Sequence, residues 1–199
     1  MNTQMPRLCF GGSFNPIHHG HLLCARAAAE RLGFEGVLLI PTAQPPHKPD
    51  QTQLAEAKDR LEMCRLAVAG DNFFSVSDLE MTRSGPSYTL DTIRQLKSNG
   101  WGTVSWLIGA DMLNYLPKWH RPLEIIQEAN LVVMARPGWQ FDWGKLGSPY
   151  QNLRQNVVEA PLIDISATAC RGRVAAGLSI AYLTPPAVCQ YIADNGLYR

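Results

Sequence analysis

The chain has almost no net charge, no paired cysteines and no long apolar run, and each of these absences excludes a class of protein. Its formal net charge is +1 over 199 residues, which argues against a broad basic surface for nucleic acid. Its five cysteines include no Cys-x-x-Cys pair, so we expect neither a disulfide framework nor a structural zinc site. No apolar run reaches the roughly 20 residues of a membrane span, and the first residues show no signal peptide. We therefore expect a cytoplasmic protein with no membrane or nucleic-acid partner.

The cysteines that are present fit the same compartment. Cys9, Cys24 and Cys64 lie in apolar patterns, and we expect them to be small core residues in a reducing environment. A hydrophobic content of 46% is ordinary for a globular chain, and 199 residues allow one domain with a sizeable core.

Short apolar runs alternate with helical patterns along the chain, and this alternation indicates an α/β fold. Strands are expected at residues 7–11, 37–40, 73–76, 103–108 and 131–135, with a last one at 157–163. Helices are expected at 19–32, 52–69 and 89–98 and from 167 onward, the last one opened by Pro185 and Pro186. The pattern predicts a Rossmann-like, doubly wound parallel sheet with a small C-terminal helical subdomain. One continuous domain would hold a core over 1–160 and a helical part over 161–199.

The most informative segment is Gly-Gly-Ser-Phe-Asn-Pro-Ile-His-His-Gly-His-Leu at residues 11–22, between the first strand and the first helix. Gly11 and Gly12 allow a ligand to approach the backbone closely, although an ordinary tight turn would also use them. His18 and His21 are three residues apart and share a helix face at an N-terminus that favours anions. These features indicate a phosphate site. A metal site is disfavoured because no third ligand is suitably spaced, and either histidine alone could be a cap or a core residue.

A second anion-binding candidate is Ile-Ser-Ala-Thr-Ala-Cys-Arg at residues 165–171. Ser166 can cap a helix, which leaves Thr168 in the first turn and Arg171 one turn later. Two hydroxyls and an arginine at a helix N-terminus suit a polyphosphate. The alternative, a plain helix cap with a surface arginine, stays open when this segment is taken by itself.

Three loops should meet at one edge of the predicted sheet. The loops at 11–21, 41–49 and 109–120 each follow an expected strand, and ligands bind beyond the carboxyl ends of parallel strands. All five histidines of the chain fall in these loops. This clustering predicts a ligand site there.

Together the two phosphate motifs resemble those of the nucleotidylyltransferase superfamily. Further segments narrow the resemblance to the bacterial nicotinate-nucleotide adenylyltransferases, and these are 40–48, 86–92, 108–111, 117–120, 135–138 and 196–199. The resemblance covers nearly the whole chain outside residues 139–160, to which we assign no role. Ser13 and Asn15 depart from the threonine and aspartate usual in that family, and Thr42 stands where an asparagine is common.

The resemblance implies an enzyme that transfers the adenylyl group of ATP to nicotinate mononucleotide and releases pyrophosphate, as a step of NAD biosynthesis. The nucleophile would be the phosphate of the mononucleotide, which is largely dianionic near neutral pH, so no general base is required. His18 and His21 are the implied catalytic residues. Mg²⁺ would bind mainly through the ATP phosphates, without a metal site of the protein itself. ATP and nicotinate mononucleotide are the implied partners of a monomer or homodimer.

The resemblance also implies two sets of binding residues. Those for ATP are Gly11, Gly12, Ser13, Phe14, Gly109, Asp111, Ser166, Thr168 and Arg171. Those for the mononucleotide are Thr42, His47, Lys48, Tyr88, Thr89, Trp119, His120 and Arg136. The nicotinate ring would stack on Trp119, and backbone amides near Thr89 and His120 would take its carboxylate. Asp111 could instead cap the next helix, and His47 and Lys48 could belong to a solvated loop.

Two other functions compete with this one. A phosphopantetheine adenylyltransferase of the same fold lacks the segments at 40–48 and 86–92 and is typically shorter. A non-catalytic nucleotide-binding protein could lose His18 or His21 without penalty, yet both are present. Class I aminoacyl-tRNA synthetases share a similar histidine motif, but this chain is too short for their further domains.

Overall fold

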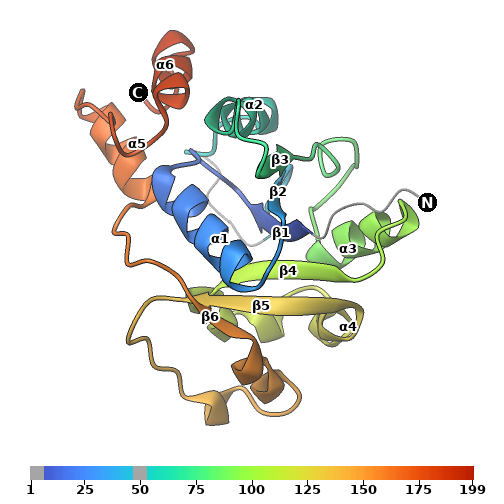
Figure 1. Ribbon diagram of the computed structural model, residues 1–199. Coiled ribbons are helices and arrows are strands. Elements are labelled where there is room, and N and C mark those ends of the chain that lie inside the picture. The colour runs from blue at the N-terminus through green and yellow to red at the C-terminus, as the bar shows by residue number, and fades with distance from the viewer. Residues whose placement is uncertain (1–6, 47–52) are drawn as a thin grey trace.

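The computed structural model describes residues 7–46 and 53–199, and in this part of the chain six strands form one parallel sheet (Figure 1). The strands are β1 (Arg7–Gly12), β2 (Gly36–Pro41), β3 (Phe74–Val76), β4 (Val104–Gly109), β5 (Ala129–Ala135) and β6 (Val157–Glu159). In space they follow the order β3-β2-β1-β4-β5-β6, and each neighbouring pair is parallel. The predicted doubly wound α/β sheet is confirmed.

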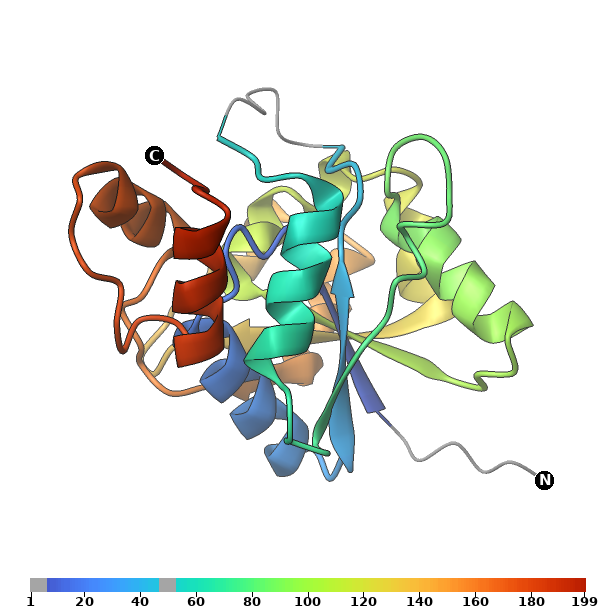
Figure 2. The ribbon, with the colours of Figure 1, turned by 90° about the horizontal axis from the view of Figure 1, so that it is seen from above.

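Helices cover both faces of the sheet. The α-helices of the described residues are α1 (His19–Arg31), α2 (Ala57–Ala67), α3 (Thr89–Ser98), α4 (Pro122–Glu128), α5 (Ala167–Ala175) and α6 (Pro186–Asp194). Short 3₁₀ helices are η1 (Ala110–Asn114), η2 (Leu116–Lys118), η3 (Trp143–Lys145) and η4 (Tyr150–Asn156). In Figures 1 and 2, α6 lies beside α2, and α3 lies well away from both.

The two faces of β1 carry two separate cores because successive side chains of a strand point in opposite directions. Leu8 and Phe10 belong to a core that α1, α2, α5 and α6 cover. Cys9 points to the other side, where it packs with residues of α3, α4 and η1. Each strand of the sheet centre is therefore buried on both faces, which is why its sequence is continuously apolar.

The C-terminal helices share the first of these cores. Val188 and Ile192 of α6 are buried in it together with residues of α1 and α2. The hydroxyl of Tyr191 donates to Asp59 Oδ1 on α2 at 2.9 Å, and His19 N donates to the carbonyl of Leu183 at 2.9 Å. These contacts agree with one continuous domain, whereas the division at residue 160 stays a prediction.

Two expected elements have different bounds in the structure, and one helix was not expected. The helix expected at 52–69 begins only at Ala57, because Ala55 N before it donates to Asn15 Oδ1 at 3.0 Å rather than entering a helix. The last strand ends at Glu159 instead of 163. Helix α4 was not expected at all. It begins after Arg121, whose φ of 52° is left-handed, with Pro122 in its first turn.

The end of β1 depends on a residue without a side chain. A Cβ on Gly11 would lie 2.4 Å from Cζ2 of Trp106, which is only 3% exposed and cannot move away. We predict that Gly11→Ala lowers the free energy of unfolding by about 1–3 kcal/mol, measured by urea denaturation. The control is Gly102→Ala, because a Cβ on Gly102 would meet nothing within 4 Å. Equal stability of the two variants would contradict the close packing.

Candidate active site

The strand order reverses between β1 and β4, and two cavities open at this point beyond the carboxyl ends of the strands. Their volumes are about 640 Å³ and about 290 Å³. The residues that line both cavities are Phe10, Gly11, Gly12, Gly109 and Met112. The two cavities are therefore neighbours that share a wall made largely of glycine backbone.

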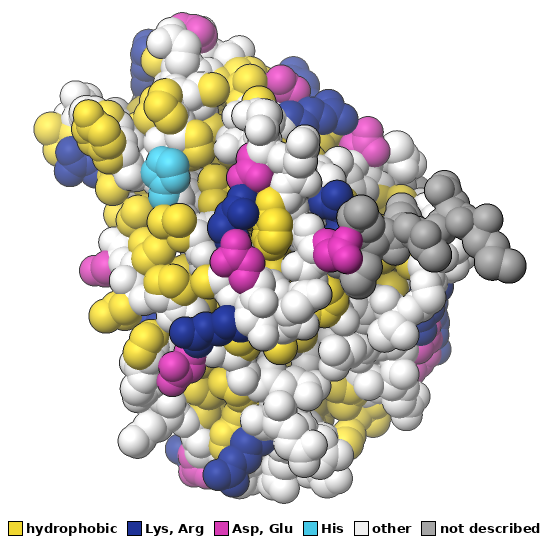
Figure 3. All heavy atoms as spheres, viewed as in Figure 1, with side chains coloured by type: hydrophobic (Ala, Val, Ile, Leu, Met, Phe, Trp, Pro, Cys, Tyr) yellow, Lys and Arg dark blue, Asp and Glu magenta, His cyan; other side chains and the backbone are white. Residues whose placement is uncertain are grey.

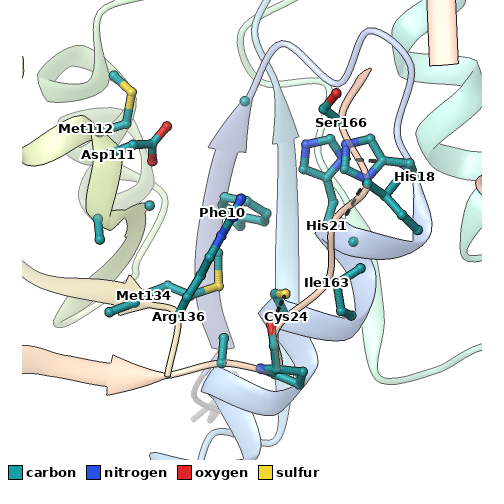
Figure 4. A pocket seen from close by; sticks show the side chains of 18 of the residues that line it. Phe10, His18, His21, Cys24, Asp111, Met112, Met134, Arg136, Ile163 and Ser166 are labelled. Atoms are coloured by element: carbon teal, nitrogen blue, oxygen red, sulfur yellow. Dashed lines mark hydrogen bonds between the residues drawn. The ribbon is translucent and has the colours of Figure 1, made fainter. Parts of the chain in front are cut away.

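The larger cavity contains most of the predicted ATP-binding residues. They are Gly11, Gly12, Phe14, Gly109, Asp111 and Ser166, and the two predicted catalytic residues, His18 and His21, line the same cavity. In Figure 4 the rings of His18 and His21 and the hydroxyl of Ser166 lie on one side, and Asp111 lies across from them. Asp111 does not cap η1, which begins after Gly109 without a side-chain cap in the described structure.

His18 and His21 cap helix α1 reciprocally. His21 N donates to His18 Nδ1 and His18 N donates to His21 Nδ1, both at 3.3 Å. The rings stack with their centroids 3.6 Å apart. Because each Nδ1 accepts a hydrogen bond, a neutral ring carries its hydrogen on Nε2. The capping arrangement therefore fixes the tautomer of both histidines at the cavity.

Burial makes His18 a neutral residue. Its side chain is 5% exposed, and this burial, with the charge of His19 adding to it, lowers the pKa of His18 to about 4. At neutral pH His18 is thus a hydrogen-bond donor without charge, and it is not an acid that could give up a proton.

Helix α5 begins where the sequence predicts, but Ser166, Thr168 and Arg171 do not all face the same cavity. Ser166 caps α5 by accepting from Ala169 N at 3.1 Å, and it lines the larger cavity. Thr168 and Arg171 instead line a separate cavity of about 440 Å³. Arg171 Nη1 donates to the carbonyl of Asn15 at 2.9 Å, which turns its guanidinium toward the β1–α1 loop.

The smaller cavity contains most of the residues predicted to bind the mononucleotide. They are Thr42, Tyr88, Thr89, Trp119 and His120. Thr89 is the first residue of α3, and the rings of Tyr88 and His120 stack at 4.1 Å. Ser13 also lines this cavity, whereas Arg136 lines the larger one. His47 and Lys48 lie outside the described residues.

Two side chains near the cavities differ from expectation. Cys24, expected in the core, is half-buried and lines the larger cavity, where its thiol contacts the carbonyl of Pro161 at 3.5 Å. Burial raises the pKa of the Cys24 thiol and the charge of Arg136 opposes this. Trp139 was given no role, yet it lines the same cavity and stacks on Phe141 at 5.3 Å. No sequence periodicity pointed to Trp139.

Asn15 explains one departure from the family pattern. Its Nδ2 donates to the carbonyl of Gln53 at 2.8 Å, and its Oδ1 accepts from Ala55 N at 3.0 Å and from the hydroxyl of Tyr198 at 2.7 Å. Burial raises the pKa of Tyr198, so this phenol stays a donor. A carboxylate could not donate to Gln53. The amide therefore joins the β1–α1 loop to the segment before α2 and to the C-terminus.

Arg60 and Glu80 are buried charged residues that sequence reasoning missed. Arg60 is completely buried on α2, and Glu80 is 3% exposed and lines the smaller cavity. For Arg60 a signal existed, because Arg60, Met63 and Cys64 have the i, i+3, i+4 spacing of one helix face. For Glu80 no periodic pattern was available.

Neither a metal-binding cluster nor a membrane-spanning helix is found among the described residues. Residues 7–46 and 53–199 contain no group of three or more His, Cys, Asp or Glu side chains that could hold a metal ion. In the same residues, no helix has the length and apolarity needed to cross a membrane. On the face shown in Figure 3, basic and acidic side chains are interspersed.

Comparison with known proteins shows first that the chain belongs to the cytidylyltransferase-like class. The cytidylyltransferase-like family model matches residues 9–173. A Plasmodium falciparum nicotinic acid mononucleotide adenylyltransferase, solved in complex with NaAD, has the same fold, with a TM-score of 0.75 over 98% of both chains at 17% identity.

Closer relatives define the family. A protein of Herpetosiphon aurantiacus is 43% identical over 94% of this chain and 96% of its own length. One of Roseiflexus sp. is 41% identical over 99% of this chain and 100% of its own. Both are named "Probable nicotinate-nucleotide adenylyltransferase". The chain therefore belongs to the nicotinate-nucleotide adenylyltransferase family.

The lowered pKa of the buried His18 predicts how the stability of the fold depends on pH. Between its lowered pKa of about 4 and the ordinary value of 6.5, His18 binds a proton in the unfolded chain but not in the folded one. We therefore predict that this residue makes the free energy of unfolding fall as the pH drops from 6.5 toward 4. In NMR spectra, His18 should titrate near pH 4, and its neutral form should be the Nε2–H tautomer. A midpoint near 6.5 would contradict the assignment.

Proposed function

We propose that the protein transfers the adenylyl group of ATP to nicotinate mononucleotide, forming nicotinate adenine dinucleotide and pyrophosphate in NAD biosynthesis. The observation that carries this proposal is the pair of neighbouring cavities that share Gly11, Gly12 and Gly109. Two substrates bound side by side across a wall of glycine can bring their phosphates together. The names of the full-length relatives support the same reaction.

ATP would occupy the larger cavity. His18 and His21 would donate Nε2–H hydrogen bonds to its phosphates, and the hydroxyl of Ser166 lies on the same side (Figure 4). Asp111, across the cavity, would accept from a ribose hydroxyl. The glycine turn allows the phosphate chain to approach the backbone closely. We propose that Thr168 and Arg171 bind the leaving pyrophosphate. Arg171 would then have to give up its hydrogen bond to the carbonyl of Asn15 and donate to a phosphate oxygen instead.

The mononucleotide would occupy the smaller cavity. Its flat, electron-poor ring suits stacking on Trp119. The N-terminus of α3 at Thr89 suits the ring carboxylate, because backbone N–H groups and the helix dipole favour an anion there. Thr42 and the stacked pair of Tyr88 and His120 form part of the walls of this cavity. The predicted roles of His47, Lys48 and Arg136 toward this substrate stay proposals.

The chemistry then needs alignment and charge stabilisation rather than acid–base catalysis. An oxygen of the mononucleotide phosphate attacks the α-phosphorus of ATP, the new P–O bond forms, and the bond to pyrophosphate breaks with its electron pair. The nucleophile is already a dianion, with a second pKa of about 6, so no proton has to be removed. Neutral donors such as His18 stabilise the charge that develops on the transferring group.

Mg²⁺ is the metal that we propose for this reaction. A single carboxylate, Asp111, lines the larger cavity among the described residues, which fits an ion held mainly by phosphate oxygens and water. When bound, the ion neutralises phosphate charge. A cytoplasmic location and a monomeric or homodimeric state also belong to the proposal.

Substrate specificity tests the proposed function directly. With ATP and Mg²⁺, we expect pyrophosphate release with nicotinate mononucleotide to exceed that with nicotinamide mononucleotide by more than about tenfold in kcat/KM. The reason is that an amide cannot replace a carboxylate at the N-terminus of α3. Absence of release with both substrates would contradict the proposed function. Equal rates would contradict the proposed recognition of the carboxylate.

The role of the histidines can be separated from their contribution to folding. We predict that His21→Ala lowers kcat by about 10²–10³-fold, as loss of one transition-state donor does. The free energy of unfolding should fall by only about 1 kcal/mol, because one helix-capping contact is lost. Pyrophosphate release and thermal melting measure the two effects. His19→Ala is the control, since His19 lines neither cavity. A collapsed melting midpoint with normal kcat would show a structural residue.

A further inference from the structure

The carbonyl oxygens of two loops of the site converge on one side chain, that of Arg60. Its Nη1 donates to the carbonyls of Ser13 at 2.9 Å and Thr42 at 2.6 Å, and its Nη2 donates to that of Ala43 at 3.0 Å. Its Nε donates to the carbonyl of Ala55 at 2.9 Å. Ser13 follows β1, and Thr42 and Ala43 follow β2. One guanidinium on α2 therefore ties these two loops together.

Only arginine can make this set of contacts. The guanidinium offers five N–H donors in a rigid planar fork, whereas a lysine ammonium is a compact charge at the end of a flexible stem. Arg60 is completely buried, and within residues 7–46 and 53–199 the groups it bonds are carbonyl oxygens, not carboxylates. Each buried carbonyl left without a donor would cost about 1–3 kcal/mol. The guanidinium of Arg60 thus serves to hold backbone carbonyl groups in place.

The loop after β2 is also bonded to the segment that precedes α3. Glu80 is 3% exposed and accepts from Thr92 Oγ1 at 2.6 Å. Burial raises the pKa of Glu80, and the Ser87 hydroxyl and the Ala43 backbone N–H act against that rise. Ser87 in turn bonds Gln44 twice, from its N to the Gln44 carbonyl at 2.9 Å and from Gln44 N to its Oγ at 3.1 Å. Arg60 thus bonds the carbonyls of Thr42 and Ala43, and Ser87 bonds both backbone groups of Gln44, so three successive residues of this loop are fixed.

The loops joined by Arg60 contribute to both cavities. Gly12, next to Ser13, lines both of them, and Ser13 and Thr42 line the smaller one. We propose that Arg60 is a positioning residue that sets the mononucleotide phosphate at reacting distance from the α-phosphorus of ATP. This inference rests on the proposed function. Reacting atoms must be about 3–3.5 Å apart, and a misplacement of about 1 Å can cost roughly 10²-fold in rate.

The test is Arg60→Lys, which keeps the charge but cannot serve both loops. We expect kcat to fall about 10–100-fold, with KM for ATP and for nicotinate mononucleotide each changing by less than about threefold. Near-UV circular dichroism and thermal melting show what fraction is folded at the assay temperature, so kcat is counted per folded molecule. A purely structural role would lower the melting temperature without changing that value.

The matched control is Arg7→Lys. Arg7 also bonds backbone, donating to the carbonyl of Phe73 at 3.3 Å, but it lies at the first residue of β1, at the opposite edge of the sheet from the site. This variant should keep the kcat of the wild type. An Arg60→Lys enzyme with kcat within about twofold of the wild type would overturn the positioning role alone. A wild type inactive with ATP and nicotinate mononucleotide would overturn the proposed function as well.

Discussion

The reversal of strand order between β1 and β4 is the constraint on which the whole site depends. Because all strands are parallel, the loops after β1, β2 and β4 leave the same edge, and at the reversal the loops after β1 and β4 diverge. Two cavities lie there with a common wall, and Gly11, Gly12 and Gly109 form most of that wall. A Cβ on Gly109 would lie 2.5 Å from Asp111 Oδ1, and one on Gly12 would lie 3.1 Å from the Phe14 ring. The strand order supplies the crevice, and a side chain at any of these glycines would crowd a residue that lines it.

An edge of this kind leaves backbone groups beyond the reach of the sheet ladder, and buried side chains must satisfy them. Arg60 bonds carbonyls that follow β1 and β2, and Asn15 bonds the carbonyl of Gln53 and the N–H of Ala55. Ser87 bonds both backbone groups of Gln44 in the same loop that Arg60 contacts. These polar groups add little apolar contact. Their effect is to give irregular loops one fixed arrangement, which a reaction between two bound substrates requires.

How far the sequence predicts this molecule depends on how local each signal is. The central strands are continuous apolar runs, and α3 matches its predicted bounds of 89–98 because a helix-opening threonine and a closing Asn-Gly mark them. Helix α4 was missed because it has only seven residues and begins directly after a left-handed Arg121. The glycine and histidine pattern of the site is equally local. The direction in which Arg171 points, and the bonds of Arg60, depend on segments distant in sequence, so one helix pattern could not reveal them.

The capping of His18 explains how a neutral donor would be kept in place for the proposed reaction. Protonating His18 would require Nδ1 to carry a hydrogen, and the hydrogen bond from His21 N to that atom would be lost. The same hydrogen bond therefore caps the start of α1 and keeps the hydrogen of His18 on Nε2, at the cavity that this residue lines. Burial holds the pKa of His18 near 4, so both persist at neutral pH. In the proposed reaction the nucleophile is already a dianion, so it calls for an oriented donor rather than a proton acceptor, and the neutral His18, with its Nδ1 engaged in the helix cap, would supply such a donor without changing its protonation.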